Sequence, residues 1–203
     1  MMDTWEYFST PVYIDKLEEY HSDAERITNK HLDSVKETLT LDTIYPNWQT
    51  NNFIDDEHLV NLRTEIIKRC SFILDDQGYD ISNYELFFTE FWAQEHLTGS
   101  GHERHVHGDN VLTGFYFIKC PANGCRLVIY EPRPAKEFST YLPEKNNSVA
   151  SHASQIINFT PEIGQLTIFN AFIPHSFTRN ESEDSSIFIH FNVGARYKPA
   201  EII

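Results

Sequence analysis

The sequence is short of basic residues and of cysteines, and each shortage excludes a class of protein. Lys and Arg together number 16 against 30 Asp and Glu, so the net charge is −14. A protein of this charge repels a phosphate backbone, and no Lys/Arg cluster offsets the repulsion, so we expect no nucleic-acid partner. The three cysteines, Cys70, Cys120 and Cys125, follow no disulfide framework spacing. They indicate reduced thiols in a cytoplasmic protein.

Long apolar runs are also missing. The first 17 residues have neither the basic start nor the apolar stretch of a signal peptide. No other run approaches the roughly 20 apolar residues that span a bilayer. With 203 residues, the chain is long enough for a substantial core and short enough for one domain, 1–203.

The N-terminal third has helical periodicity. Apolar residues recur at steps of three and four over residues 19–40 and, more clearly, over 56–75. We expect two helices here, the second laying one face on a sheet. Residues 5–15 alternate aromatic and β-branched side chains around Pro11, which predicts a short edge strand that could also pair in an oligomer.

From residue 84 the pattern changes to short strands separated by Gly and Pro. The expected strands are 84–94, 111–120, 125–132, 154–161, 164–172 and 185–197. No helical pattern intervenes, so the segment 84–197 predicts an antiparallel sandwich or barrel, supported by the helices of residues 1–83. Residues 131–154 are polar and weakly patterned, and we interpret them as an excursion over the barrel.

The stretch "HERHVHGDN", residues 102–110, concentrates metal-binding side chains directly before a strand. If this stretch is extended, His105, His107 and Asp109 share one face, because side chains alternate along a strand. Either His105 with His107 or His107 with Asp109 could chelate one ion. His175, after Pro174, is the best distant candidate for a third ligand.

Two histidines and a carboxylate on one face of an ion leave three positions open, as in non-haem Fe(II) oxygenases. A 2-oxo acid can fill two of these positions and dioxygen the third. We favour His107, Asp109 and His175, because a carboxylate partly neutralises Fe(II) in a pocket of low dielectric constant. His105 in place of Asp109 stays open as the alternative.

Several further segments resemble the 2-oxoglutarate/Fe(II)-dependent oxygenase superfamily, in particular a small group common in bacteria and phages. The matching segments are "YFSTPVYI" (7–14), "FWAQ" (91–94), His105 and His107 with "TGFYFIK" (113–119), "GCRLVIYEPR" (124–133), Pro161, Gly164, Leu166, Phe169 and His175, and Phe191-Asn192. The resemblance implies a double-stranded β-helix (jelly-roll, cupin-like) core, Fe(II) and 2-oxoglutarate as cofactors, and hydroxylase-type oxidation of a small molecule or a protein side chain.

The resemblance also implies a buried Arg about eleven residues after the distal histidine, where it would bind the far carboxylate of 2-oxoglutarate. This chain has Ser186 there. Arg179, Arg126 and Lys119 are the candidate replacements, with Tyr116 as an assisting hydroxyl from the earlier strand. His190 shares the parity of Ser186 and could face the pocket.

Two other functions stay open at this point. The same barrel could be a binding or structural module that has lost its oxo-acid site, as the missing Arg would suggest. It could also be a cupin-like metalloprotein that uses no oxo acid. The fold alone does not choose between these functions.

Overall fold

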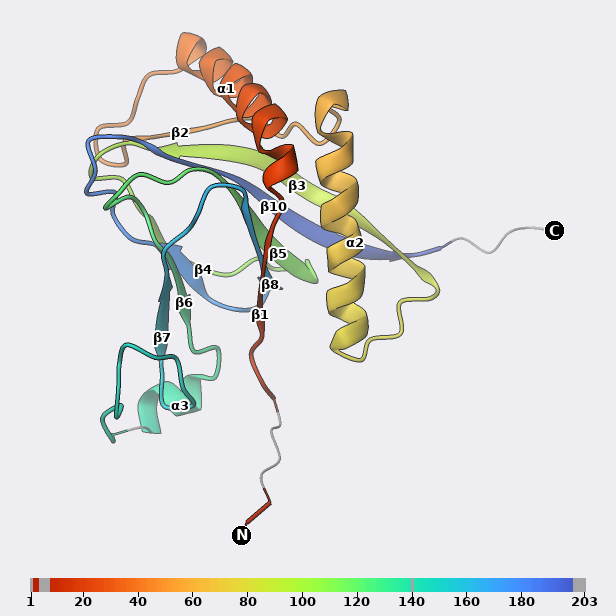
Figure 1. Cartoon of the computed structure of the whole chain (residues 1–203), viewed down its shortest axis with the longest axis vertical. Coiled ribbons are helices and arrows are strands. Elements are labelled where there is room, and N and C mark those ends of the chain that lie inside the picture. Colours follow the sequence, from red (N-terminus) through yellow and green to blue (C-terminus); the bar gives the residue numbers. More distant parts are fainter. Residues whose placement is uncertain (1, 4–7, 140, 199–203) are drawn as a thin grey trace, which may run out of the picture.

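Two antiparallel β-sheets face each other in this computed structural model, and helices cover the outer face of the larger sheet (Figure 1). The structure describes residues 2–3, 8–139 and 141–198, so the first part of the expected edge strand, residues 5–7, lies outside it. The larger sheet has the order β1-β8-β5-β10-β3-β2, and the smaller one β4-β9-β6-β7. This arrangement confirms the double-stranded β-helix.

Ten strands form the two sheets in the part of the chain that the structure describes. Their bounds are β1 Val12–Lys16, β2 Asn47–Gln49, β3 Tyr84–His96, β4 His102–His105, β5 Leu112–Lys119, β6 Leu127–Tyr130, β7 Ile156–Phe159, β8 Gln165–Asn170, β9 His175–Phe177 and β10 Ser186–Tyr197. The six strands expected after residue 84 are all present. The short strands β2, β4 and β9 were not expected, because three or four residues carry too little alternation to detect.

The two expected helices are confirmed with small shifts in their bounds. They are α1 (His21–Thr38) and α2 (Val60–Asp76), each preceded by a single 3-10 turn. Before α2, the Asp56 carboxylate accepts a hydrogen bond from the backbone N–H of His58 at 3.0 Å, which satisfies one exposed donor of the turn. The excursion after β6 is mostly loop and contains one short helix, α3 (Pro134–Ser139).

Strand alternation divides the interior into two cores. On β10, Ile187 and Ile189 pack toward the helices, whereas Phe188 packs between the two sheets. On β5, Tyr116 and Phe117 divide in the same way. The core between the sheets is therefore lined by aromatic rings, and residues of β10 with the parity of Phe188 face it.

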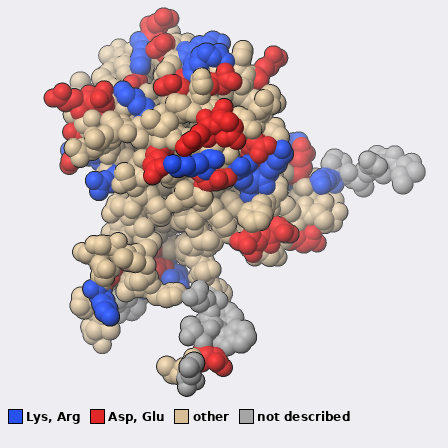
Figure 2. Space-filling view, in the orientation of Figure 1, with Lys and Arg blue, Asp and Glu red and all other residues tan. Residues whose placement is uncertain are grey.

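Charge is unevenly distributed over the molecule. Figure 2 shows charged side chains gathered over the part that carries α1 and α2, whereas the part around β7 and α3 is mostly uncharged on this face. Among the described residues, no helix has the length and apolar character that crossing a membrane requires.

Candidate metal centre

Three histidines converge where β4 ends and β9 begins. His105 and His175 are direct partners across the β4–β9 ladder, with ring centroids 4.4 Å apart. His107 follows two residues later, and its backbone N–H donates to the carbonyl of Ala171 at 3.0 Å. One ligand atom from each ring lies within 4.8 Å of the others, so the three rings could hold one ion.

Backbone carbonyls fix the orientation of two of these rings. His175 Nδ1 lies 3.0 Å from the carbonyl oxygen of Ile173, and His105 Nδ1 lies 2.7 Å from that of Glu103. An Nδ1–H donated to a carbonyl leaves the Nε2 lone pair for a metal, which is the usual arrangement of metal-bound histidines. The Nε2 of His175 is buried without a hydrogen-bond partner, as is that of His107.

Burial keeps the rings in the metal-binding protonation state. Desolvation lowers the pKa of His107 to about 3 and that of His175 to about 2, with smaller contributions from neighbouring histidines. Both rings are therefore neutral at pH 7. Neutral imidazoles with unpartnered nitrogens suit Fe(II) and other first-row divalent ions, so the residues present fit a metal.

Asp109 lies outside this group. The expectation that residues 105–109 are extended is wrong beyond His105, where β4 ends. The chain turns at Gly108–Asp109, Asp109 has a φ of 62°, and its side chain is exposed. A turn breaks the strand alternation that would have placed Asp109 beside His107. The geometry favours His105 as the third ligand, and this assignment stays a prediction.

The expected anchors for the oxo acid lie away from the three histidines. Tyr116 is fully buried on the helix side of β5, where its hydroxyl donates to the Leu17 carbonyl at 2.8 Å. It therefore faces the core beside the helices and not the core between the sheets. Lys119 pairs with Asp184 at 3.5 Å, and Arg126 and Arg179 are exposed. Of the residues that the structure describes, no arginine or lysine is buried.

Ser186 faces the interior, as its parity with Phe188 requires, but it is already engaged. It is 5% exposed, and its Oγ accepts a hydrogen bond from the Cys125 N–H at 3.0 Å. A Cβ added to Gly124 would lie 2.6 Å from that oxygen. The loop before β6 therefore closes over this end of the interior and fills the space that a long side chain would need.

Imidazoles occupy the interior where the arginine was expected. His96 is the direct ladder partner of Ser186, it is fully buried, and its Nε2 has no hydrogen-bond partner. His96 Nδ1 lies 2.7 Å from Ser100 Oγ. His102 links this ring to the metal group, with ring centroids 6.5 Å from His96 and 4.3 Å from His105. His96 was not among the site residues predicted from the sequence, although it lies at the end of a strand.

A hollow of about 660 Å³ opens on the side of the metal group, away from Ser186. Ile129 and Ile157 line the hollow. Ile129 is also the ladder partner of His175, so β6, which lines the hollow, is the neighbour of the strand that carries this histidine. Its other walls are the start of the chain before β1 and the excursion between β6 and β7. Its size is that of pockets that bury small ligands.

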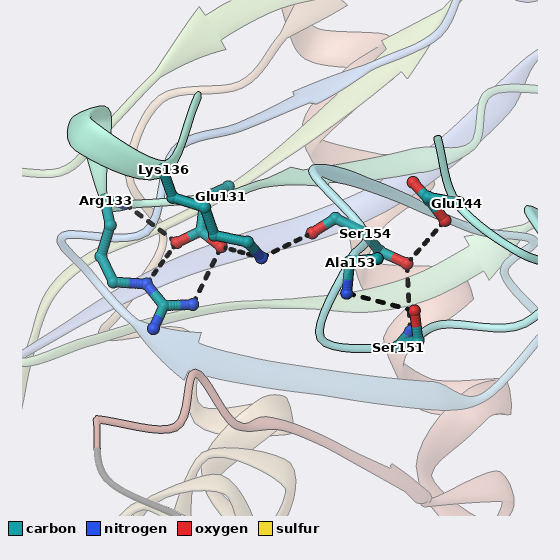
Figure 3. Close-up of polar contacts among 7 residues, drawn as sticks. All are labelled: Glu131, Arg133, Lys136, Glu144, Ser151, Ala153 and Ser154. Atoms are coloured by element: carbon teal, nitrogen blue, oxygen red, sulfur yellow. Dashed lines mark hydrogen bonds and ion pairs between the residues drawn. The ribbon is translucent and has the colours of Figure 1, made fainter. Parts of the chain in front are cut away.

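An ion network holds the excursion in place at the wall of this hollow (Figure 3). The Glu131 carboxylate accepts from Arg133 Nε at 2.6 Å and from Lys136 Nζ at 2.7 Å. Lys136 also donates to the Ser154 carbonyl at 3.1 Å, which joins the two ends of the excursion. The hydrogen bonds from Arg133 are the largest cause that lowers the pKa of Glu131 to about 2.

Glu131→Gln is expected to lower the free energy of unfolding near neutral pH and to have less effect in acid. Because the folded pKa is lowered, the carboxylate stabilises the fold above the unfolded pKa, and this contribution is lost as the pH falls from about 4.5 to about 2. We expect a loss of about 1 kcal/mol at pH 6, after allowance for solvent screening. Urea unfolding at pH 6 and pH 3 measures it. An equal loss at both values would contradict this ionic account.

The comparisons with known proteins agree with this geometry. The family described as "Putative 2OG-Fe(II) oxygenase" matches residues 90–192, half of the chain, and the match includes all three histidines. No curated protein sequence matches the chain.

Solved structures show the same fold at low identity. A Pseudomonas putida prolyl-4-hydroxylase is 11% identical, with a TM-score of 0.59, covering 93% of this chain and 94% of its own. HygX from Streptomyces hygroscopicus, with nickel, 2-oxoglutarate and hygromycin B bound, is 9% identical, with a TM-score of 0.60 and coverages of 91% and 83%. A Trichoplax adhaerens prolyl hydroxylase, in complex with a hypoxia inducible factor peptide, is 13% identical, with a TM-score of 0.57 and coverages of 90% and 83%. With the family match over the histidine region, the chain belongs to the 2OG-Fe(II) oxygenase family.

Proposed function

We propose that this protein is an Fe(II)- and 2-oxoglutarate-dependent dioxygenase that oxidises a C–H bond, with iron held by His105, His107 and His175. The observation that carries the proposal is the convergence of three imidazoles, two of them oriented by backbone carbonyls. When bound, Fe(II) and 2-oxoglutarate supply the oxidation, in which dioxygen is consumed and succinate and carbon dioxide are released.

Three histidine ligands give this centre a different charge from a centre with a carboxylate ligand. Neutral imidazoles leave the full double positive charge of the ion in place, whereas a carboxylate ligand would cancel part of it. A dianionic oxo acid is attracted more strongly to the uncancelled charge, especially where the surroundings are buried. This attraction supports oxo-acid binding in a pocket without a buried arginine or lysine among its described residues.

The far carboxylate of the oxo acid needs hydrogen-bond donors in the interior. The His102 ring neighbours both His105 of the metal group and the buried His96. The Nε2 of His96 is a buried polar atom without a partner, which is costly unless a ligand or water satisfies it. We therefore assign this role to His96, assisted by His102, ahead of the exposed Arg179, Arg126 and Lys119.

His96→Gln is expected to weaken 2-oxoglutarate binding about tenfold, since one hydrogen bond to a charged group contributes roughly 1.5 kcal/mol. The metal affinity should not change, because His96 is not a member of the three-histidine group. Calorimetry with the Mn(II)-loaded protein under anaerobic conditions measures both affinities. Lys119→Met is the matched control. If Lys119→Met, Arg126→Gln or Arg179→Gln loses binding while His96→Gln keeps it, the anchor is that cation instead.

The hollow beside Ile129 and Ile157 is the proposed substrate site. It adjoins the metal end of the sandwich, and its lining combines an apolar floor with the polar residues of the excursion. Its opening and volume suit a small molecule or a protein side chain. HygX has hygromycin B bound and the Trichoplax prolyl hydroxylase is in complex with a peptide fragment, which supports a substrate of either kind.

The decisive test is succinate formation from 2-oxoglutarate with and without Fe(II), in wild type and in His175→Ala. We expect slow, iron-dependent succinate release in wild type even without a substrate, and none in the variant. Metal binding without any succinate, together with undetectable 2-oxoglutarate binding, would instead favour a cupin-like metalloprotein that uses no oxo acid.

A further inference from the structure

A second group of possible metal ligands lies against the first. Glu90 and His190 come from the neighbouring strands β3 and β10, and together with His107 they place three ligand atoms within 4.8 Å of one another. The His107 ring stacks on His175 at 5.1 Å and on His190 at 4.7 Å, both at an interplanar angle of 27°. His107 is therefore common to both groups.

The polar atoms around this second group are unusually poor in partners. His190 is 1% exposed, and neither of its ring nitrogens makes a hydrogen bond. The Asn192 Oδ1 and the His107 Nε2 are also buried without a partner. Each such atom is destabilising when nothing satisfies it. Several of them at one place indicate a ligand that the surrounding side chains are built to receive.

The chemistry of the three ligands suits a divalent transition metal. Glu90 Oε2 lies 3.6 Å from His190 Nε2, close enough for both atoms to bind one ion. The same oxygen accepts hydrogen bonds from Asn192 Nδ2 at 2.8 Å and from Trp92 Nε1 at 3.3 Å, which hold the carboxylate in place. Two imidazoles and one carboxylate are a ligand set for Fe, Mn, Co or Zn.

Access distinguishes this group from the three-histidine group. The Glu90 side chain is 46% exposed, whereas His175 is fully buried. A hydrated ion can therefore meet the Glu90 carboxylate before it loses its water. The orientation of Asn192 also matters here. Its Nδ2 lies 3.0 Å from His107 Nδ1 and donates to it, so the neutral ring carries its proton on Nε2. An ion bound through Nε2 therefore requires the Asn192 amide to rotate, so that its Oδ1, which has no partner, accepts from Nδ1–H.

We propose that Glu90, His107 and His190 form a second metal position that shares His107 with the three-histidine position. Because His107 offers one nitrogen, the two positions exclude each other, and the chain holds one ion at a time. This second position shares only His107 with the metal site of the proposed function, and it depends on that function in no other way. It predicts that loss of a ligand used by the first position alone moves the ion to the second instead of releasing it.

The experiment is a titration with Co(II), followed by calorimetry and by the visible absorption bands of the bound ion. Wild type should bind one Co(II). His175→Ala should still bind one Co(II), more weakly and with a changed spectrum. His175→Ala/Glu90→Gln should bind at least tenfold more weakly than His175→Ala. His175→Ala/Glu85→Gln is the matched control, since Glu85 lies on the same strand but pairs with Arg196.

The outcomes separate this proposal from the proposed function. If wild type binds Co(II) and folded His175→Ala does not, the second position is rejected and the three-histidine site stands. If Glu90→Gln leaves the residual binding of His175→Ala unchanged, His105 and His107 alone hold the ion and the proposal also fails. If Glu90→Gln alone abolishes binding while His175→Ala has no effect, the three-histidine site is the one rejected. His105→Ala repeats the test should His175→Ala fail to fold by circular dichroism.

Discussion

His107→Ala is expected to abolish binding of divalent ions altogether. His107 belongs to both groups of ligands that the described residues form, so no complete set of three remains after its removal. The remaining pair of His105 and His175 leaves an ion with two protein ligands, too few for the facial arrangement. Metal content after dialysis against equimolar Fe(II), with Co(II) titration as a second measurement, checks this result.

Asp109→Ala provides the matched control for that variant. Asp109 is exposed, in a turn two residues further along the chain, and should leave the metal content at the wild-type value. A loss of metal in Asp109→Ala, with retention in His107→Ala, would restore the carboxylate ligand that the sequence pattern favoured and would show that the turn at Gly108–Asp109 rearranges around the ion.

Ser186→Arg is expected to destabilise the fold by at least about 3 kcal/mol. Overpacking of a filled core costs roughly 1–3 kcal/mol, and burial of an unpaired charge adds several more. The space is closed by the loop that carries Gly124, and Cys125 would lose the oxygen that accepts its N–H. The free energy of unfolding in urea measures this effect, with Ser186→Thr as the conservative comparison.

The opposite outcome for Ser186→Arg would be informative. If the variant is as stable as wild type and binds 2-oxoglutarate more tightly, the loop at Gly124 can open and the far carboxylate reaches position 186. The role assigned to His96 would then be wrong, because a ligand anchored at position 186 would not need it.

The sequence predicted the architecture well where periodicity was strong. Helical steps of three and four in the first third, and short alternating segments after residue 84, correspond to α1, α2 and six of the strands. Both signals arise because each element buries one side against a neighbour. The ligand chemistry of the sequence also predicted that His107 and His175 lie together, and their ring centroids are 5.1 Å apart.

The orientation of Tyr116 could not be predicted for a physical reason. Strand β5 is buried on both faces over nearly all of its length, so its apolar run carries no alternation from which to read a direction. The position of Asp109 depended on where β4 stops, and the prediction gave the alternation of metal ligands more weight than the turn-forming residues Gly108, Asp109 and Asn110. Glu90 and His96 became candidates only when β3 was seen beside β10, a pairing between segments about one hundred residues apart.

The central position of β10 has a consequence for how the protein is made. β10 lies between β3 and β5 and pairs with both, yet it is the last of the ten strands to leave the ribosome. Until then β3 and β5 each lack a neighbour, and the nascent chain presents two apolar strand edges, the condition that favours aggregation. His190 and Asn192 also arrive only with β10, so we expect the second metal position to form only after β10 is inserted, and chaperone binding to the nascent chain to end at that step.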